Sequence, residues 1–316
     1  MCLSVSPVRN KTPSESLEII LGMKPIDLRI RELSLLAMLR IIPKSESKWS
    51  ELGIGYNGHL NVGKKELISM GISFDSYESF DVTNEFNIDK KYRVNLDSFK
   101  SGIPTTDDHF SITCYTDGSK MNDKAGFGFG ITQGNWVKAY DNGQLGPLNS
   151  VFQAEIYALK ACAEKLMEFD DSNITIFSDS QAALWAVSNH IIAQKSVADC
   201  ANALNTLSIT RNVELKWVKA HFNYVGNEFA DMQAKQGTMN NENRVFLPPP
   251  LSWARHRVKL GIDEIWSERF KKSPGLNQTK FWLSKNEKKV TNYLLNLSRK
   301  DLGLMIQIIT GHCFLK

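Results

Sequence analysis

Between residues 111 and 237, apolar residues recur at two different spacings. Some segments have an apolar residue at every second position, as in a β-strand, and others have apolar residues at helical spacing. The segments S-I-T-C-Y-T-D, G-F-G-F-G-I-T-Q-G and N-W-V-K-A-Y-D read as three strands joined by turns that contain glycine. Residues 151–169 carry apolar side chains at helical spacing. The later segments predict a strand at 173–178, helices at 180–189 and 197–207, a strand at 213–219 and a helix at 227–237. This order predicts an α/β fold with a five-stranded mixed sheet and helices on both faces.

The segments on either side of this region are organised differently. Residues 12–42 predict two helices that end at Pro43, whereas residues 44–108 lack a sustained period and predict a connector with at most short strands. After Asn241, the run L-P-P-P-L-S-W-A marks a break that precedes two amphipathic segments. We therefore expect three parts: a helical segment and connector at 1–108, a central domain at 109–240, and a basic helical extension at 241–316.

Charge and aromatic residues gather in the last part. The 316 residues carry a net charge of +4, but residues 241–316 hold 14 Lys and Arg against 6 Asp and Glu, which is 14 − 6 = +8. A basic surface favours nucleic acid as a partner. The aromatic residues of this part either stack on bases or pack helices together, and packing is slightly favoured; they are Trp253, Trp266, Phe270, Phe281 and Trp282.

Composition excludes several classes of protein. With 42% hydrophobic and 23% charged residues, the chain has the make-up of a soluble protein with a packed core. Its five cysteines are scattered without a C-x-x-C pair, which favours a reducing compartment. The N-terminus lacks an apolar signal region, and no apolar stretch is long enough to span a bilayer. We expect an intracellular protein, nuclear or cytoplasmic, that is neither secreted nor bound to a membrane.

Four acidic residues stand in distinctive local sequences. Asp117 lies in C-Y-T-D-G-S-K, Glu155 in F-Q-A-E-I-Y-A-L, Asp179 in F-S-D-S-Q-A-A-L, and Asp231 ends H-F-N-Y-V-G-N-E-F-A-D. Carboxylates that are gathered from strands and helices repel one another unless divalent cations neutralise them. Taken singly, each has an ordinary explanation as a turn residue, a helix cap or a solvated side chain.

Together these motifs resemble the ribonuclease H family over roughly residues 111–240, in the version carried by non-LTR retrotransposon polyproteins. The markers are D-G-S-K, A-E, S-D-S and the closing W-V-K-A-H-x-x-x-x-G-N-E-x-A-D. The flanks T-P-S-E-S-L-E-I-I-L-G and L-N-Q-T-K-F-W-L resemble the segments before and after the nuclease in such polyproteins. No Tyr-x-Asp-Asp polymerase motif is present, so the chain resembles a fragment of such an element or a host gene derived from one.

The resemblance implies an endonuclease that cuts the RNA strand of RNA–DNA hybrids. Asp117, Glu155, Asp179 and Asp231 would hold two Mg²⁺ ions roughly 4 Å apart, with Mn²⁺ as a substitute. His221 would assist product release by proton transfer. The resemblance also implies contacts with the nucleic-acid backbone, and a reverse transcriptase on another chain is a candidate partner. The residues assigned to substrate binding are Gly118, Ser119, Ser180 and Asn227.

One other function stays open, and a second is disfavoured. A remnant that has lost catalysis would still bind nucleic acid or protein, and truncation is the route to it. A transposase or integrase on the same fold is disfavoured by the G-N-E-x-A-D ending.

Overall fold

A mixed β-sheet organises the middle of the chain. The protein was analysed as a computed structural model that describes residues 12–48, 57–72, 78, 86–96, 111–192, 194–222, 224–283 and 288–313. Strands β3 (Ile112–Met121), β4 (Lys124–Gln133) and β5 (Trp136–Leu145) form an antiparallel meander. Strands β6 (Asn173–Ser178) and β8 (Asn212–Trp217) extend the sheet on the β3 side, each parallel to its neighbour. These five strands are the ones that the sequence predicts.

The predicted mixed sheet is confirmed, but the described sheet has seven strands rather than five, in the order β2-β8-β6-β3-β4-β5-β9. Strand β2 (Arg93–Asn95) pairs parallel to β8, and β9 (Arg244–Val245) pairs parallel to β5. Strands this short are too brief to carry an alternating pattern. A separate two-stranded sheet joins β1 (Phe86–Asn87) to β7 (Ile191–Ile192).

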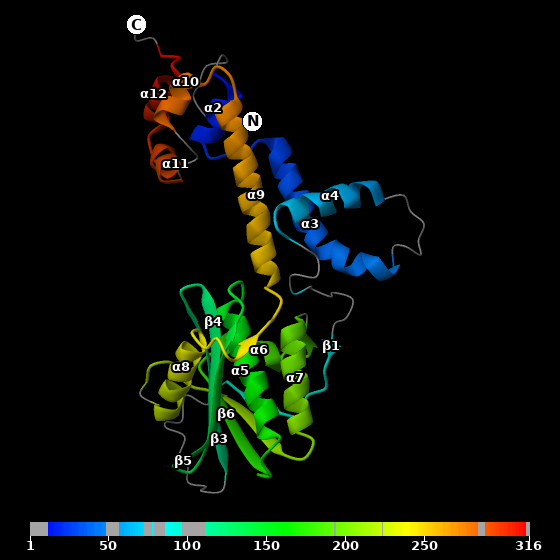
Figure 1. The fold of residues 1–316 in the computed structure, drawn as a ribbon. Helices are drawn as coiled ribbons and strands as arrows, with labels where there is room; N and C mark the ends of the chain where they lie inside the picture. Colours follow the sequence, from blue (N-terminus) through cyan, green and yellow to red (C-terminus); the bar gives the residue numbers. More distant parts are fainter. Residues whose placement is uncertain are drawn as a thin grey trace. The chain divides into compact units, whose positions relative to one another are not determined.

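Helices cover both faces of the large sheet, as predicted. Helices α5 (Val151–Leu166), α6 (Gln181–Ser188) and α7 (Lys195–Leu207) lie on one face, and α8 (Val225–Gly237) lies on the other (Figure 1). The alternation in β4 explains the contact with α8. A Cβ on Gly128 would lie 2.3 Å from the backbone nitrogen of Ala234 in α8, while Phe127 of the same strand meets Tyr157 of α5 edge to face. Glycine on one side therefore lets α8 approach the strand, and aromatic rings fill the core on the other.

A buried glutamine fixes the start of α5. Ser150 and Gln153 form a reciprocal capping box. Gln153 is 2% exposed, and its amide nitrogen donates to the carbonyl oxygen of Pro248 at 2.8 Å and to Glu78 Oε2 at 3.2 Å. Its amide oxygen accepts from Asn149. The first turn of α5 is thus tied to segments far away in the sequence.

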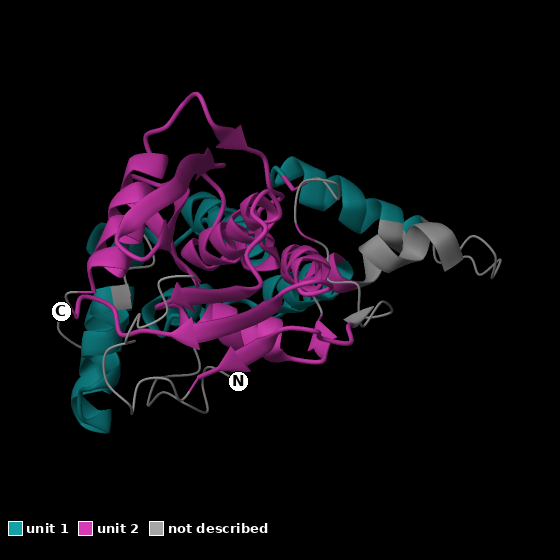
Figure 2. Ribbon diagram, turned by 90° about the horizontal axis from the view of Figure 1, so that it is seen from below, with its two compact units in different colours: residues 1–38, 58–71, 255–316 teal, residues 39–57, 72–254 magenta. Residues whose placement is uncertain are grey.

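The chain divides into two compact units, one of residues 1–38, 58–71 and 255–316 and the other of residues 39–57 and 72–254 (Figure 2). The large sheet belongs to the second unit. The helices with residues in the first are α2 (Ser14–Ile20), α3 (Ile26–Lys48), α4 (Asn57–Ser69), α9 (Leu251–Lys272), α10 (Asn277–Trp282), α11 (Lys288–Leu295) and α12 (Arg299–Thr310). Among the described residues, we find no helix with the length and apolar character needed to cross a membrane.

The first unit joins both ends of the sequence in one core. Ser16 of α2 and Thr279 of α10 share a buried hydrogen bond of 3.0 Å between their hydroxyl groups. Arg269 of α9 donates two hydrogen bonds to the carboxylate of Asp27, at 3.0 and 2.8 Å. Trp266 and Phe270 of α9 are buried in this unit, so the structure shows that these two aromatic side chains pack.

Helix α4 lies in the segment for which we expect only a connector with short strands, and that expectation is wrong here. Its sequence N-G-H-L-N-V-G-K-K-E-L-I-S contains two glycines, which lower helix propensity. A Cβ on Gly63 would lie 2.0 Å from Met38 Sδ. Gly63 therefore weakens the helical pattern in the sequence and also lets the helix pack closely against Met38.

Candidate active site

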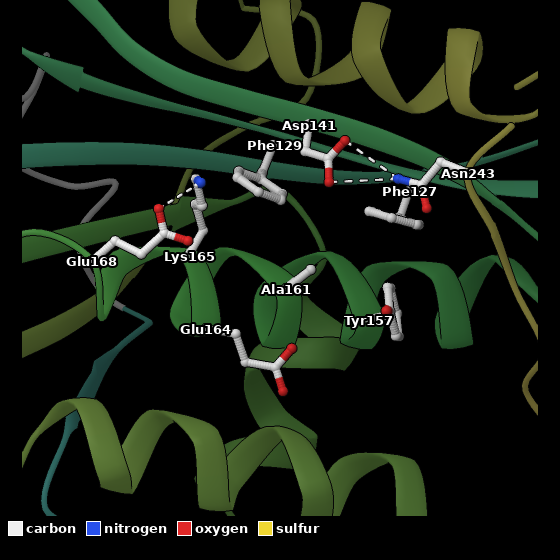
Figure 3. A pocket seen from close by; sticks show the side chains of 9 residues that line it. All are labelled: Phe127, Phe129, Asp141, Tyr157, Ala161, Glu164, Lys165, Glu168 and Asn243. Carbon is white, nitrogen blue, oxygen red and sulfur yellow. Dashed lines mark hydrogen bonds and ion pairs between the residues drawn. The ribbon is translucent and has the colours of Figure 1, made fainter.

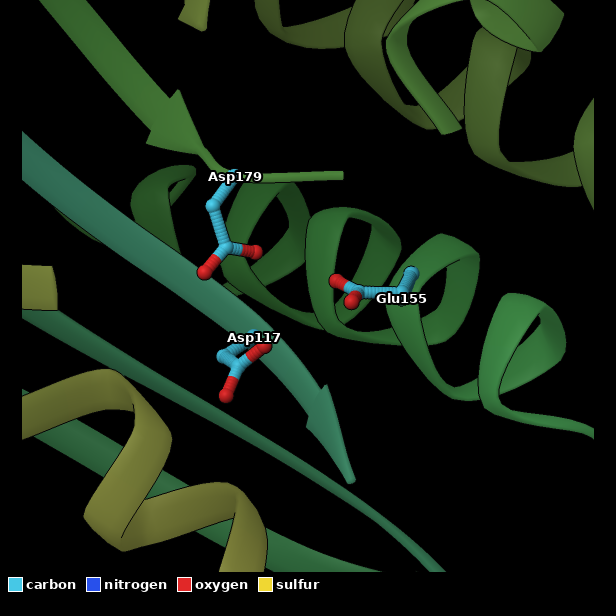
Figure 4. A group of neighbouring side chains, drawn as sticks. All are labelled: Asp117, Glu155 and Asp179. Carbon is cyan, nitrogen blue, oxygen red and sulfur yellow. The ribbon is translucent and has the colours of Figure 1, made fainter. Parts of the chain in front are cut away.

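Three of the four predicted carboxylates converge at the edge where β3 and β6 meet α5. Asp117, Glu155 and Asp179 each offer an oxygen atom, and these atoms all lie within 4.8 Å of one another. Figure 4 shows the three side chains pointing toward a common point from β3, from α5 and from the end of β6. Asp117 and Glu155 are both 6% exposed. This is a small, partly enclosed acidic site.

Strand pairing and one glycine bring these side chains together. The parallel ladder between β3 and β6 ends at the pair Thr116 and Ser178, so Asp117 and Asp179 both follow the last pair. Gly118 then allows α5 to approach, because a Cβ there would lie 2.5 Å from the backbone nitrogen of Glu155. Real side chains do not tolerate such a distance, so glycine is needed in D-G-S-K for helix packing. The motif therefore positions Glu155 as well as Asp117.

Burial and the charges of neighbouring acids raise the pKa values of all three acids. Desolvation is the largest cause for Asp117, followed by the charges of Asp179 and Asp231, and together they raise its pKa to about 7. Burial, then Asp117 and Asp179, raise the pKa of Glu155 well above its ordinary value. Burial also raises the pKa of Asp179, although a hydrogen bond from Asn227 and the proximity of His221 oppose the change. Ionised together, the three acids need a nearby positive charge.

The donor atoms suit a hard divalent cation. Glu155 Oε2 is buried and has no hydrogen-bond partner among the described residues. Buried carboxylate oxygens are normally satisfied, so a buried atom without a donor requires an explanation. A site built from carboxylate oxygens matches the preference of Mg²⁺ and, less strictly, Mn²⁺. The residues present therefore fit a magnesium site.

Asp231 and His221 lie beside this cluster without joining its tight core. Asp231 is near enough to raise the pKa of both Asp117 and Asp179, yet its Oδ2 accepts a hydrogen bond of 2.6 Å from Lys235 Nζ. His221 has a positive φ of 53° and a side chain that is 77% exposed. Its Nδ1 lies 4.0 Å from Glu228 Oε1. An exposed imidazole close to buried acids is accessible both to solvent and to a substrate.

The residues predicted to bind substrate have contacts within the protein. Asn227 is 3% exposed, and its Nδ2 donates to Asp179 Oδ2 at 3.1 Å. Ser180 caps α6 by accepting from the backbone nitrogen of Ala183, and Gly118 donates its backbone N–H to Asp117 Oδ1. Ser119 is half-buried on β3. In this arrangement Asn227 orients a carboxylate.

Sequence reasoning missed two side chains that contact the site. Lys235 pairs with Asp231, and their i, i+4 spacing on a predicted helix is a signal that was available. Trp217, the first residue of the closing motif, donates from Nε1 to the backbone oxygen of Asp179 at 3.0 Å, a contact that the motif alone did not predict.

A separate open pocket of about 260 Å³ lies between α5 and strands β4 and β5 (Figure 3). It contains none of the predicted site residues. Its wall combines aromatic rings with charged groups, and two of the charged groups, Lys165 and Glu168, pair with each other at 2.6 Å. The residues that line it are Phe127, Phe129, Asp141, Tyr157, Ala161, Glu164, Lys165, Glu168 and Asn243.

The central region is similar to known proteins. A protein-family model described as RNase H matches residues 109–239. Two similar solved structures are RNase H1 from the halophilic archaeon Halobacterium salinarum NRC-1 and the N-terminal RNase H domain of Rv2228c from Mycobacterium tuberculosis, the latter solved as a fusion with maltose-binding protein. The first is 20% identical with a TM-score of 0.34 and covers 40% of this chain and 96% of its own. The second is 17% identical with a TM-score of 0.35 and covers 40% and 98%.

No curated protein matches the chain. The family match agrees with the order of strands and helices, and the α/β fold of the RNase H type is confirmed. Over residues 109–239 this protein is similar to the RNase H family.

Proposed function

We propose that this domain is an endonuclease that hydrolyses the RNA strand of RNA–DNA hybrids. One observation carries the proposal: three carboxylates from β3, α5 and the end of β6 meet within 4.8 Å, and one buried oxygen of Glu155 lacks a partner among the described residues. Packing alone does not require buried acids that repel one another. The RNase H family match supports the same chemistry.

Asp117, Glu155 and Asp179 would hold Mg²⁺, with Asp231 beside them. When bound, the metal neutralises the carboxylates and supplies Lewis-acid activation of water together with stabilisation of the leaving oxygen. In the reaction a water molecule attacks phosphorus, the bond from phosphorus to the 3′ oxygen breaks, and the products carry a 5′-phosphate and a 3′-hydroxyl.

The protein groups have separable tasks in this proposal. Asn227 holds the carboxylate of Asp179 in one orientation through its 3.1 Å hydrogen bond. His221, exposed on the loop before α8, is positioned to exchange a proton with the departing product. Lys235 competes for Asp231, so that acid would turn from the lysine toward the site when a cation is present. We assign Gly118, Ser119 and Ser180 to the rim on which the nucleic-acid backbone lies.

The proposal extends to the origin and the partners of the protein. The flanking segments T-P-S-E-S-L-E-I-I-L-G and L-N-Q-T-K-F-W-L support derivation from a non-LTR retrotransposon. A nuclease of that origin would act in the nucleus or cytoplasm, beside a reverse transcriptase on another chain. The predicted partner is tested by asking whether a reverse transcriptase copurifies with this protein while that enzyme is copying an RNA template.

The activity is tested with the purified 316-residue protein, Mg²⁺ and four end-labelled substrates. These are an RNA–DNA hybrid, single-stranded RNA, duplex RNA and duplex DNA. We expect cleavage of the RNA strand in the hybrid alone. Asp179→Asn should abolish it, and Asp170→Asn, an exposed aspartate outside the cluster, should not. A folded protein that cuts nothing in Mg²⁺ or Mn²⁺ would overturn the proposal and favour the binding remnant.

A further inference from the structure

Two large aromatic side chains stand in solvent on the short helix α10. Phe281 is 80% exposed and Trp282 is 53% exposed. Their rings meet edge to face, with centroids 5.4 Å apart and planes at 86°. Isolated exposed apolar residues are common, but a contiguous pair of this size forms a patch that marks interaction surfaces.

The core of the first unit fixes this exposure. Thr279 within α10 and the cap residues Leu276 and Leu283 at its two ends are all buried. Thr279 is also held by its hydrogen bond to Ser16. Phe281 follows Thr279 by two residues, so α10 cannot turn it inward without exposing its buried face. Trp282 follows Thr279 by three residues and lies nearer that face, which agrees with its lower exposure. The two rings are therefore presented by a helix whose rotation is set.

The helix that carries the aromatic pair is tied to the basic end of α9. Lys280 Nζ donates to the backbone oxygens of Lys271 and Ser273, which ties α10 to the C-terminal end of α9. The last turn of α9 carries Arg269, Lys271 and Lys272. Arg269 is engaged with Asp27, whereas the side chains of Lys271 and Lys272 are 59% and 81% exposed and share Glu268 as a partner at 3.0 and 3.7 Å. Exposed pairs of this kind exchange readily with other anions.

We propose that Phe281 and Trp282, with Lys271 and Lys272, form a second nucleic-acid site that binds single-stranded RNA or DNA by base stacking. Aromatic faces accept any unpaired base, and lysines beside them contact the phosphates. Charge complementarity favours a polyanion over a protein, because residues 255–316 carry 13 Lys and Arg against 5 Asp and Glu, which is 13 − 5 = +8. Duplex bases are stacked on one another and do not offer free faces, so the site selects single strands. It is distinct from the carboxylate cluster, and neither residue of the pair contributes to hydrolysis.

Binding is measured by fluorescence anisotropy in EDTA, with labelled single-stranded RNA and DNA of about 12 nucleotides and with duplex DNA of the same sequence. We expect both single strands to bind more tightly than the duplex. Trp282→Ala should weaken single-strand binding about tenfold, and Phe281→Ala should act in the same direction. Trp282→Phe should restore most of the affinity because it keeps a stacking face. Lys272→Gln should reduce the steepness of log affinity plotted against log salt concentration by about one, which corresponds to the loss of one phosphate contact.

Leu304→Ala serves as the matched control, since Leu304 is a 46% exposed apolar residue of α12 in the same unit. It should bind as the wild type does, and thermal unfolding should confirm that each variant is folded. Unchanged single-strand affinity in the folded Phe281→Ala and Trp282→Ala variants would overturn the proposal. Loss of self-association in those variants without loss of RNA binding would overturn it in favour of a protein contact.

Because EDTA prevents hydrolysis, the result is independent of the nuclease proposal. If the protein binds single strands through Trp282 but cuts no hybrid, only the proposed function is refuted. If the protein cuts hybrids and the Trp282→Ala variant binds single strands as tightly as the wild type does, only this inference is refuted.

Discussion

Replacing Asp117 by asparagine should stabilise the metal-free protein at neutral pH while removing its activity. Burial and the neighbouring acids raise the pKa of Asp117 from its ordinary value near 4 to about 7. An acid whose folded-state pKa lies above its unfolded value holds an extra proton when folded between those values, so stability falls as the pH rises through that window. The penalty is absent below the unfolded pKa and complete above the folded one.

A rise of the Asp117 pKa from its ordinary value to about 7 corresponds to about 4 kcal/mol of folding free energy at about pH 8. Asparagine keeps an oxygen that can accept from Gly118 and carries no charge. We therefore expect Asp117→Asn to gain about 1–4 kcal/mol at about pH 8 and almost nothing at about pH 4. Saturating Mg²⁺ should erase the difference at high pH by stabilising the wild type alone.

Native-state hydrogen exchange of the β3 and β6 amides measures this, because it reports the stability of the unit that holds the site. Asp170→Asn, at an exposed position, is the control for loss of one negative charge. If the β3 and β6 amides of Asp117→Asn are no better protected from exchange than those of the wild type at about pH 8 in EDTA, the argument that these acids oppose folding is refuted.

Three further substitutions test how the site is built. Gly118→Ala should lower the melting temperature and reduce hybrid cleavage, because its Cβ would lie 2.5 Å from the backbone of Glu155; Gly58→Ala, with open space around it, is the control in thermal unfolding. Gln153→Ala should cost about 2–3 kcal/mol in chemical denaturation, since it leaves buried partners of α5 unsatisfied; a loss below about 0.5 kcal/mol would contradict that role. Asn227→Asp should raise the Mg²⁺ concentration that gives half-maximal rate or alter its pH profile, because it replaces the donor to Asp179 with a charge; an unchanged metal and pH dependence would exclude a positioning role.

The sequence predicted the central fold because its strands and helices are long and periodic. The alternation of Phe127 and Gly128 in β4 is visible in the order of the amino acids, and the structure confirms that the two residues face opposite layers. The motifs around Asp117, Glu155 and Asp179 predicted a cluster that the described residues do form. Their catalytic roles stay predictions.

Other features depend on contacts between distant segments and leave no local pattern. The hydrogen bond between Ser16 and Thr279 spans 263 positions, so nothing in either neighbourhood announces that the two ends share a core. Helix α4 was missed because Gly63 lowers helix propensity for the sake of packing against Met38. Composition also could not separate buried from exposed aromatic residues: Trp266 and Trp282 have similar basic surroundings, and only the first is buried.

The central claim is that buried carboxylates hold Mg²⁺ for hydrolysis of the RNA strand, and a comparison of two glutamates on α5 tests it most directly. Single-turnover cleavage of a labelled hybrid should be followed across Mg²⁺ concentrations for the wild type, Glu155→Gln and Glu164→Gln, the last altering a half-exposed glutamate of the same helix. We predict products with 3′-hydroxyl ends, a rate that rises with Mg²⁺, a loss of at least about 100-fold in Glu155→Gln, and no change in Glu164→Gln. Cleavage by Glu155→Gln at the wild-type rate and with the same Mg²⁺ dependence would contradict the account.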